Sequence, residues 1–263
     1  MRPLSARNPR VQRLARLVRR GDERAEQRVL VVEGPVLLGA ALDAGIAVLE
    51  VFIDEGVAER PMITELGLRL PAEVTRWVLP AGTLDRVGDA ATSQGIIAVV
   101  ERRDPSWPAP DTTAFVLVLA EVADPGNVGT LVRAAAASGA GTAVIAGGAD
   151  PTNPKVVRAS AGAIFAIDVV RSASAGDAVA RLQAVGYRVA ATTVSGGVAY
   201  HRADLGSPLA VVVGNEAHGL TDDLIARTDL ALTVPMTGPV QSLNVAMAGT
   251  VICFEVLRQA SAV

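Results

Sequence analysis

Short apolar runs alternate with helix-like stretches throughout the carboxy-terminal part of the chain, and this alternation limits the possible folds more than any other feature. The run Ala114–Leu119 has no polar residue, as expected of a strand that is covered on both faces. Later runs predict strands at Thr142–Ala146, Ile167–Val170, Arg188–Thr193, Leu209–Val213 and Ala231–Val234. Helices are expected at Val128–Ser138, Pro154–Ala161, Asp177–Ala184 and from about Leu243 to Gln259. This order predicts an α/β domain with a parallel sheet.

A smaller α/β unit is predicted over residues 1–100. Its expected strands are Val29–Glu33, Val48–Asp54, Val74–Leu79 and Gly95–Val100, and its expected helices are one that begins after a cap at Asn8, Val36–Ala44 and Thr83–Ala90. The segment 101–111 has three prolines and several charges but no apolar periodicity, so we interpret it as a linker. The larger domain then covers residues 112–263.

Composition supports this fold class and excludes several kinds of protein. Half of the 263 residues are hydrophobic but only 3% are aromatic, so the core is expected to consist mainly of Ala, Val, Leu and Ile. No apolar run approaches the length of a membrane span, and the N-terminus opens with arginines rather than a signal peptide. The single cysteine, Cys253, excludes an internal disulfide and a thiolate zinc cluster, and we expect it to be buried and inert. We expect a cytoplasmic protein without a bound metal.

Positive charge is concentrated at the N-terminus. Residues 1–28 hold nine arginines and three acidic residues, a net charge of +6, which leaves −9 for the rest of a chain whose total is −3. Such a basic arm is suited to binding RNA phosphates, and Arg7, Arg10, Arg13 and Arg16 are the residues we expect to bind RNA. The alternative is a solvated helix face in a chain that uses arginine almost to the exclusion of lysine.

Three polar segments follow predicted strands, where ligands bind in open α/β sheets. They run from Glu121 to Arg133, from Gly214 to Leu220 and from Val234 to Val245. Taken singly, each fits an ordinary turn between a strand and a helix. Together they gather Asn, Arg, Glu and Ser side chains at one edge of the sheet. The chain has neither a GxGxxG nor a GxxxxGK[ST] motif, which argues against a dinucleotide site or a P-loop.

These segments together resemble the SpoU-type (TrmH) branch of the SPOUT RNA methyltransferases. The shared motifs are Asn127 followed six positions later by Arg133, the Gly214-Asn215-Glu216 loop, and a segment with Pro235-Met236 that ends in Ser242-Leu243-Asn244-Val245. The resemblance covers about residues 112–260. It extends more loosely to the N-terminal unit, which looks like the small, ribosomal-protein-like substrate-binding domain of many members.

The resemblance implies a C-terminal deep trefoil knot, a homodimer formed through the knotted domain, and S-adenosylmethionine as cofactor. The implied reaction is methylation of a ribose 2′-hydroxyl in structured RNA, with ribosomal RNA of the 23S type favoured over transfer RNA. Two alternatives stay open: a non-catalytic RNA-binding or ribosome-assembly factor that retains the fold, and an enzyme that methylates a base. The implied cofactor-binding residues are Thr193, Gly214, Asn215, Gly219, Val234, Met236, Ser242, Leu243 and Asn244.

The family pattern gives the central catalytic role to Arg133. A guanidinium has a pKa above about 12, so it is a poor general base. Arg133 either loses a proton with help from an RNA phosphate or stays cationic and orients phosphate and hydroxyl. His218 competes for the base role, although we favour a structural histidine there. The residues expected to hold Arg133, ribose and cofactor in register are Asn127, Glu216, Ser242 and Asn244.

Overall fold

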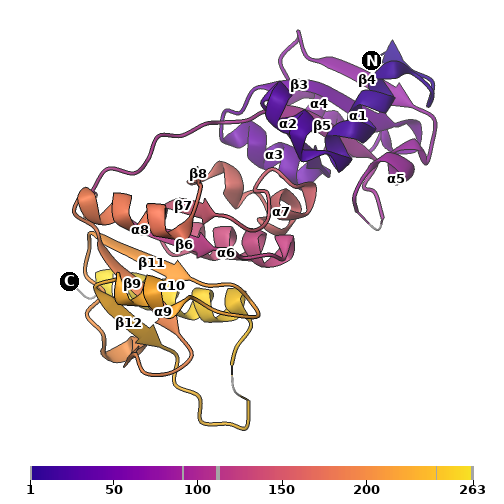
Figure 1. The fold of residues 1–263 in the computed structure, drawn as a ribbon. Coiled ribbons are helices and arrows are strands. Elements are labelled where there is room, and N and C mark those ends of the chain that lie inside the picture. The colour runs from indigo at the N-terminus through magenta and orange to yellow at the C-terminus, as the bar shows by residue number, and fades with distance from the viewer. Residues whose placement is uncertain (1, 91, 111–112, 241, 262–263) are drawn as a thin grey trace. The chain divides into compact units, whose positions relative to one another are not determined.

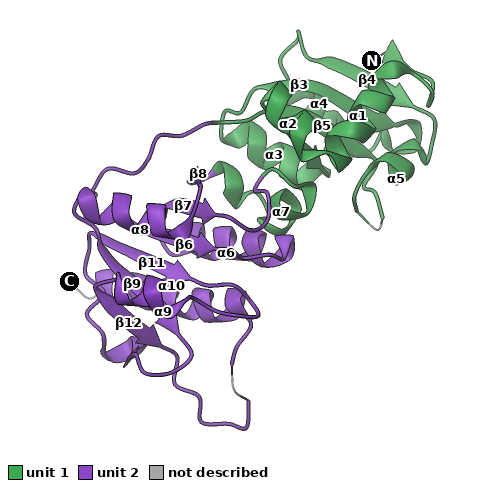
Figure 2. Ribbon diagram, viewed as in Figure 1, with its two compact units in different colours: residues 1–103, 152–165 green, residues 104–151, 166–263 purple. Residues whose placement is uncertain are grey.

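The computed structural model describes residues 2–90, 92–110, 113–240 and 242–261 (Figure 1). The chain divides into two compact units (Figure 2). Unit 1 comprises Met1–Arg103 and Thr152–Phe165, and unit 2 comprises Asp104–Pro151 and Ala166–Val263. The first division falls inside the segment that we interpreted as a linker. The predicted start of the larger domain, at residues 111 and 112, lies outside the described residues.

Unit 1 is built on a five-stranded mixed sheet with the strand order β1-β4-β3-β5-β2. Strands β1, β4 and β3 run parallel to one another, whereas β5 runs antiparallel to β2 and β3. The predicted strands at Val29–Glu33 and Val48–Asp54 are confirmed residue for residue, because both are mainly apolar and end in an acidic residue. The five strands are β1 (Arg2–Pro3), β2 (Val29–Glu33), β3 (Val48–Asp54), β4 (Thr75–Leu79) and β5 (Ile96–Glu101).

Helices cover both faces of this sheet. On one face, Leu14 and Leu17 pack with Phe52; on the other, Leu38 and Val157 belong to a second buried cluster. The helices are α1 (Pro9–Arg19), α2 (Gly21–Gln27), α3 (Pro35–Asp43), α4 (Pro61–Arg69), α5 (Thr83–Val87) and α7 (Pro154–Ala159), with 3-10 turns η1 (Glu55–Val57) and η2 (Ala163–Phe165).

Helices α2 and α4 were not expected from the sequence. In α2 the one buried residue is Arg24, so no apolar periodicity marks the helix. Its guanidinium donates hydrogen bonds to the carbonyls of Leu17 (2.8 Å) and Val18 (3.2 Å) and to the Thr152 hydroxyl (3.0 Å). It therefore satisfies carbonyl groups that the end of α1 leaves unpaired. In α4 the apolar pattern is blurred by Met62 and Leu68, which are exposed.

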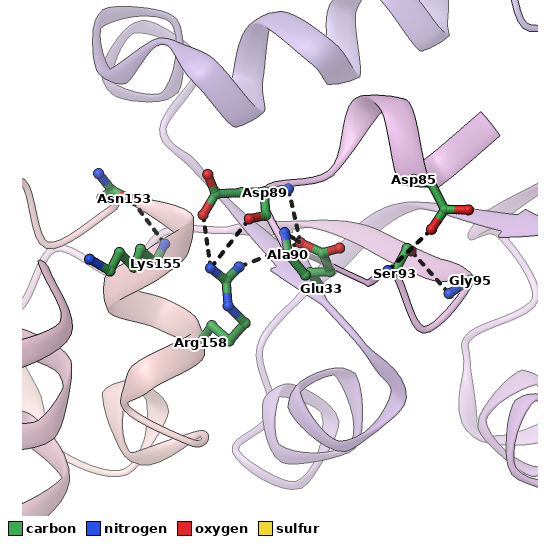
Figure 3. A network of polar contacts seen from close by, with 9 residues as sticks. All are labelled: Glu33, Asp85, Asp89, Ala90, Ser93, Gly95, Asn153, Lys155 and Arg158. Atoms are coloured by element: carbon green, nitrogen blue, oxygen red, sulfur yellow. Dashed lines mark hydrogen bonds and ion pairs between the residues drawn. The ribbon is translucent and has the colours of Figure 1, made fainter. Parts of the chain in front are cut away.

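A buried carboxylate at the end of β2 organises the loop that follows α5 (Figure 3). The Glu33 side chain is only 5% exposed, and its Oε2 accepts hydrogen bonds from the backbone amides of Asp89 (3.2 Å) and Ala90 (3.1 Å). Arg158 of α7 lies 3.6 Å from the same oxygen and pairs with the Asp89 carboxylate at 2.9 Å. The arginine thus compensates a charge that would be costly to bury alone.

Replacing Arg158 with alanine should lower the free energy of unfolding by about 2 kcal/mol, because Glu33 would lose its cation while staying buried. The expected loss of stability is smaller than for a fully buried pair, since 34% of the Arg158 side chain is exposed. Urea unfolding measures this change. The matched control is Arg171→Ala, whose exposed pair with Asp150 should contribute less than about 0.5 kcal/mol. Equal losses in the two variants would contradict the proposed role of Arg158.

Unit 2 contains the parallel sheet that the sequence predicts. Its seven strands have the order β10-β12-β9-β11-β6-β7-β8, and every neighbouring pair is parallel. All the strands predicted in this domain are confirmed, and β10 is an addition. The strands are β6 (Phe115–Ala120), β7 (Ala140–Ala146), β8 (Asp168–Ser172), β9 (Arg188–Thr193), β10 (Val198–Ala199), β11 (Leu209–Val213) and β12 (Leu230–Thr233).

Helices pack on opposite faces of this sheet. Leu182 of α8 joins a buried cluster with Val212 of β11. The next residue, Val213, points to the other face, where it approaches Gly249 of α10. A Cβ at Gly249 would lie 2.4 Å from Leu131 of α6, so α6 and α10 pack closely. The helices are α6 (Pro125–Ala137), α8 (Ala175–Ala184), α9 (Asp222–Ala226) and α10 (Val245–Ala260), with the 3-10 turn η3 (Tyr200–Arg202).

Two further observations concern α10 and the other helices. Cys253 is buried, as expected, and burial raises the pKa of its thiol to about 12, which disfavours the reactive thiolate. Within the described part of the chain, no helix is both long and apolar enough to cross a membrane.

A buried carboxylate also anchors the C-terminal part of α10. Glu255 accepts hydrogen bonds from Arg258 (2.7 and 2.9 Å) and from Gln259 (2.8 Å). Gln259 in turn accepts a hydrogen bond from the Leu205 amide at 2.9 Å. The Arg258 guanidinium, more than any other group, holds the pKa of Glu255 at about 2 instead of its ordinary 4.5.

Because this pKa is depressed in the folded chain, the stabilisation from Glu255 is complete above pH 4.5 and is lost as the pH falls toward 2. Glu255→Gln should therefore lower the free energy of unfolding at neutral pH by about 2 kcal/mol. The difference between wild type and variant should shrink between pH 4.5 and pH 2. Urea unfolding over this pH range measures it, and a difference that stays constant would be inconsistent with an ionised Glu255.

Candidate active site

A cleft of about 540 Å³ lies beyond the carboxyl ends of β9, β11 and β12. This volume is typical of small-molecule sites, and the position matches the expected ligand site of an open parallel sheet. Three loops and two helices enclose it. Its lining consists of residues 192–196, 214–220, Asp222, Ile225, Ala231, Leu232, Val234, Met236, Ser242, Leu243, Val245, Ala248 and Ile252.

The loop after β11 is a tight turn closed by its own backbone. Asn215 and Gly219 exchange two backbone hydrogen bonds, of 3.1 and 2.9 Å, and the Asn215 side chain donates to the Glu121 carbonyl at 2.8 Å. A Cβ on Gly214 would lie 2.4 Å from the carbonyl carbon of Gly219. Only glycine therefore fits at position 214, and Asn215 fixes this turn to the loop after β6.

Three side chains join the three polar segments into one hydrogen-bonded relay. The Glu216 carboxylate accepts from the amides of Ala123 (2.9 Å) and Asp124 (3.0 Å) and from the Asn127 side chain (2.9 Å). Asn127 in turn accepts a hydrogen bond from the Asn244 side chain at 3.1 Å. Asn244 also caps α10. The relay therefore fixes the start of α6, the loop after β11 and the start of α10 to one another.

The charge of Glu216 is stabilised by these donors. Burial by itself would raise the pKa of the carboxyl, but the hydrogen bonds from Ala123, Asn127 and Asp124 outweigh it, so the pKa of Glu216 is lowered. All three donors are uncharged. Glu216 is thus an ionised acceptor that holds two loops together, and its engaged oxygens are poorly placed to remove a proton from a substrate.

Arg133 stands apart from this relay. It is exposed on α6, and its side chain has no hydrogen bond or ion pair among the described residues of a single chain. Six residues along a helix correspond to a rotation of about 240° and a rise of about 9 Å, so Asn127 and Arg133 leave α6 on different faces. Arg133 does not line the cleft. One chain therefore assembles the relay and the cleft but leaves this guanidinium free.

Most of the predicted cofactor-binding residues gather at the cleft, although their role stays a prediction. Asn244 does not line it, because its side chain is used in the relay and the α10 cap. His218 lines the cleft and is exposed, while its backbone amide is hydrogen-bonded to Asn215 (3.2 Å). The predicted residues that line the cleft are Thr193, Gly214, Asn215, Gly219, Val234, Met236, Ser242 and Leu243, together with Glu216 of the predicted catalytic set.

Sequence reasoning missed the contribution of α9 to the cleft. Asp222 and Ile225 both line it, but α9 has only five residues, too few for a periodic pattern to be recognised. Leu232 and Ile252 form an apolar wall of the cleft. The sequence could have identified them, since Leu232 lies in a predicted strand and Ile252 in a predicted helix. Among the described residues, no group of three or more His, Cys, Asp or Glu side chains could hold a metal.

Arg10, Arg13 and Arg16 lie on α1, on the side opposite its buried apolar residues, and that burial is as predicted. Arg10 and Arg13 pair with Glu50 at 2.5 and 3.3 Å, and Arg16 pairs with Glu23 at 3.2 Å. About half of the Arg10 and Arg16 side chains stays exposed. Part of their charge is thus compensated within unit 1, and RNA binding by this surface stays a prediction.

The profile of the SpoU rRNA Methylase family matches residues 114–254, which include the relay and the cleft. The chain belongs to this family. It is 31% identical over 252 residues to the 23S rRNA (guanosine(2553)-2′-O)-methyltransferase of Bacillus subtilis, with 95% of this chain and 97% of the relative covered. It is 28% identical to the 23S rRNA (uridine(2479)-2′-O)-methyltransferase of Streptomyces viridochromogenes, with 98% and 92% covered.

Solved structures of related methyltransferases match nearly the whole chain. An RNA 2′-O ribose methyltransferase superimposes with a TM-score of 0.85 at 29% identity, covering 98% of both chains. An AdoMet-bound rRNA methyltransferase from Sinorhizobium meliloti gives a TM-score of 0.87 at 27% identity, covering 98% of this chain and 97% of that one. The similarity therefore extends beyond the family profile into unit 1.

The close approach at Gly214 yields a test of the cleft. Gly214→Ala should lower the free energy of unfolding by about 2 kcal/mol, because its Cβ would meet backbone rather than a movable side chain. Binding of S-adenosylmethionine, measured by calorimetry, should weaken as well. Gly238→Ala is the control, since no atom lies within 4 Å of its added Cβ, and it should be neutral or slightly stabilising. A neutral Gly214→Ala would contradict this account of the turn.

Proposed function

We propose that this chain methylates a ribose 2′-hydroxyl of ribosomal RNA. The favoured substrate is RNA of the 23S type, and transfer RNA is the second candidate. The chain is an S-adenosylmethionine-dependent RNA 2′-O-methyltransferase of the SpoU family. The observation that best supports this proposal is the relay of Glu216, Asn127 and Asn244 at the edge of the cleft. The relatives of Bacillus subtilis and Streptomyces viridochromogenes, both named as 23S rRNA 2′-O-methyltransferases, support the choice of RNA.

The cleft has the chemistry that S-adenosylmethionine requires. Leu232, Val234 and Ile252 offer an apolar wall for the adenine, while Thr193 and Ser242 supply hydroxyl groups. Glycine at position 214 lets the backbone of this turn pack closely where it lines the cleft, since a Cβ there would meet the Gly219 carbonyl. When bound, the cofactor supplies a methyl group activated by a positively charged sulfur. The chain's own residues hold the acceptor in line with that methyl group, and such positioning contributes much of the rate.

Arg133 is proposed to act as a cation that orients the RNA. A guanidinium keeps its proton in proteins and offers a planar set of donors that matches phosphate oxygens. Arg133 is exposed and uses none of these donors within the described part of one chain, so they are available to a phosphate and to the 2′-hydroxyl. Glu216 and Asn127 then act as positioning residues, because they fix the first turn of α6, the helix that carries Arg133 further along.

A homodimer and a knot complete the proposal. Met247 and Phe254 expose 62% and 46% of their surface on α10, next to the α6 helix that carries Arg133. A second copy packed on this face would cover these apolar side chains and bring Arg133 toward the cleft of its partner. The proposal of a trefoil knot draws on the strand order, in which β12 lies between β9 and β10 and precedes α10 in the chain.

Unit 1 is proposed to be the small substrate-binding domain, with Arg7, Arg10, Arg13 and Arg16 as its RNA-binding residues. Its helix α1 carries arginines that are about half exposed. Such a positively charged surface attracts RNA phosphates, whereas a neutral or acidic one does not. Ribosomal RNA as substrate also places the proposed enzyme in the cytoplasm.

Wild-type protein incubated with labelled S-adenosylmethionine and ribosomal RNA should give alkali-resistant 2′-O-methyl nucleotides. Arg133→Ala should reduce transfer at least about 100-fold, because removal of a charge-orienting donor costs that order of rate. Cofactor affinity should change less than twofold, since Arg133 does not line the cleft. Arg171→Ala, on an exposed position of β8, is the control and should leave transfer unchanged.

Other outcomes would decide between the rival functions. Methyl groups found only on bases would refute ribose as the acceptor. A wild-type chain that binds RNA but not S-adenosylmethionine would favour an assembly factor. Equal losses of transfer and cofactor affinity in Arg133→Ala would refute the proposed role of that residue.

A further inference from the structure

The cleft has an uneven set of charges. Its described lining contains two carboxylates, Glu216 and Asp222, but neither lysine nor arginine. A ligand with a positive charge is therefore favoured over a neutral one of the same shape. This matters for a methyltransferase, because the sulfur of the methyl donor is positively charged and the sulfur of the product is not.

The two carboxylates differ in how far their oxygens are engaged by hydrogen bonds within the chain. Glu216 accepts three hydrogen bonds from N–H donors of the relay. Asp222 has no hydrogen bond or ion pair among the residues that the structure describes. It lies in the first turn of α9, and Ile225, three positions later on the same side of the helix, also lines the cleft. The neighbouring Asp223 is exposed but does not line it.

We infer that Asp222 gives the cleft its preference for the charged methyl donor over the uncharged product. The inference deepens the proposed function and rests on it, since it assumes that S-adenosylmethionine occupies this cleft. Methyl transfer turns a sulfonium into a thioether, so the attraction to Asp222 is present before the reaction and absent after it. S-adenosylhomocysteine would then leave more readily than the donor, which limits product inhibition.

The expected size of the effect follows from Coulomb's law. A carboxylate roughly 6 Å from a cation in a partly exposed site, where the effective dielectric constant is about 40 to 80, changes affinity by about three- to tenfold. Because Asp222 is exposed, dissolved ions should screen this attraction. The preference should therefore weaken as salt is added, which a purely structural role of Asp222 would not produce.

Calorimetric titration of the full chain with S-adenosylmethionine and with S-adenosylhomocysteine tests the inference. Asp222→Asn should weaken binding of the donor about three- to tenfold and binding of the product less than twofold. Its effect on the donor should shrink at high salt, and Asp222→Glu should retain most of the preference. Asp223→Asn is the matched control, since it removes a carboxylate from the same turn of α9 without changing the lining of the cleft.

The inference is overturned if Asp222→Asn weakens both ligands equally, if it changes neither, or if Asp223→Asn reproduces its effect. A wild-type chain that binds neither ligand would instead overturn the proposed function, and this inference with it. The two failures are therefore distinguishable, because the first leaves wild-type binding of the donor intact.

Discussion

The Glu216 carboxylate is the interaction on which the arrangement of the site depends. Residues from three parts of the chain meet through it: the loop after β6, the turn after β11 and, by way of Asn127, the cap of α10. Its charge is stabilised by neutral N–H donors, so the pKa of Glu216 is lowered without a neighbouring cation. That leaves the only arginine of the motifs, Arg133, unused by the relay. The guanidinium that we propose for catalysis and the charge that organises the site are thus kept separate.

Much of the fold could be predicted because its strands are apolar and its helices are capped by recognisable residues. β2, β3, β9 and β11 have the predicted bounds, and the other predicted elements agree within three residues at either end. The predicted start of α6 was three residues too late, because Asp124 caps the helix and Pro125 occupies its first position. Helix α2 was missed for a physical reason: a seven-residue helix whose one buried side chain is Arg24 carries no apolar signal.

The site was predictable where a motif marked it and unpredictable where only packing defines it. Motif positions identified Gly214 and Ser242, which line the cleft. They also placed Asn244 in a cofactor-binding role, whereas the structure uses its side chain for the relay and the α10 cap. Asp222 belongs to no motif and lies in a five-residue helix. Its position at the cleft is set by the turn that precedes α9. The sequence places Arg24 in the basic arm, but in the structure it is a buried structural residue.

The assignment of Thr152–Phe165 to unit 1 limits how this chain can be divided or recombined. Between β7 and β8, the polypeptide leaves unit 2, contributes Val157 and Phe165 to the buried cluster of unit 1, and returns. Arg158 and Thr152, which satisfy Glu33 and Arg24, belong to the same excursion. A cut after Arg103 would deprive unit 1 of these contacts. The N-terminal unit is therefore not a detachable module, and an exchange of N-terminal units between relatives would have to carry both pieces of chain together.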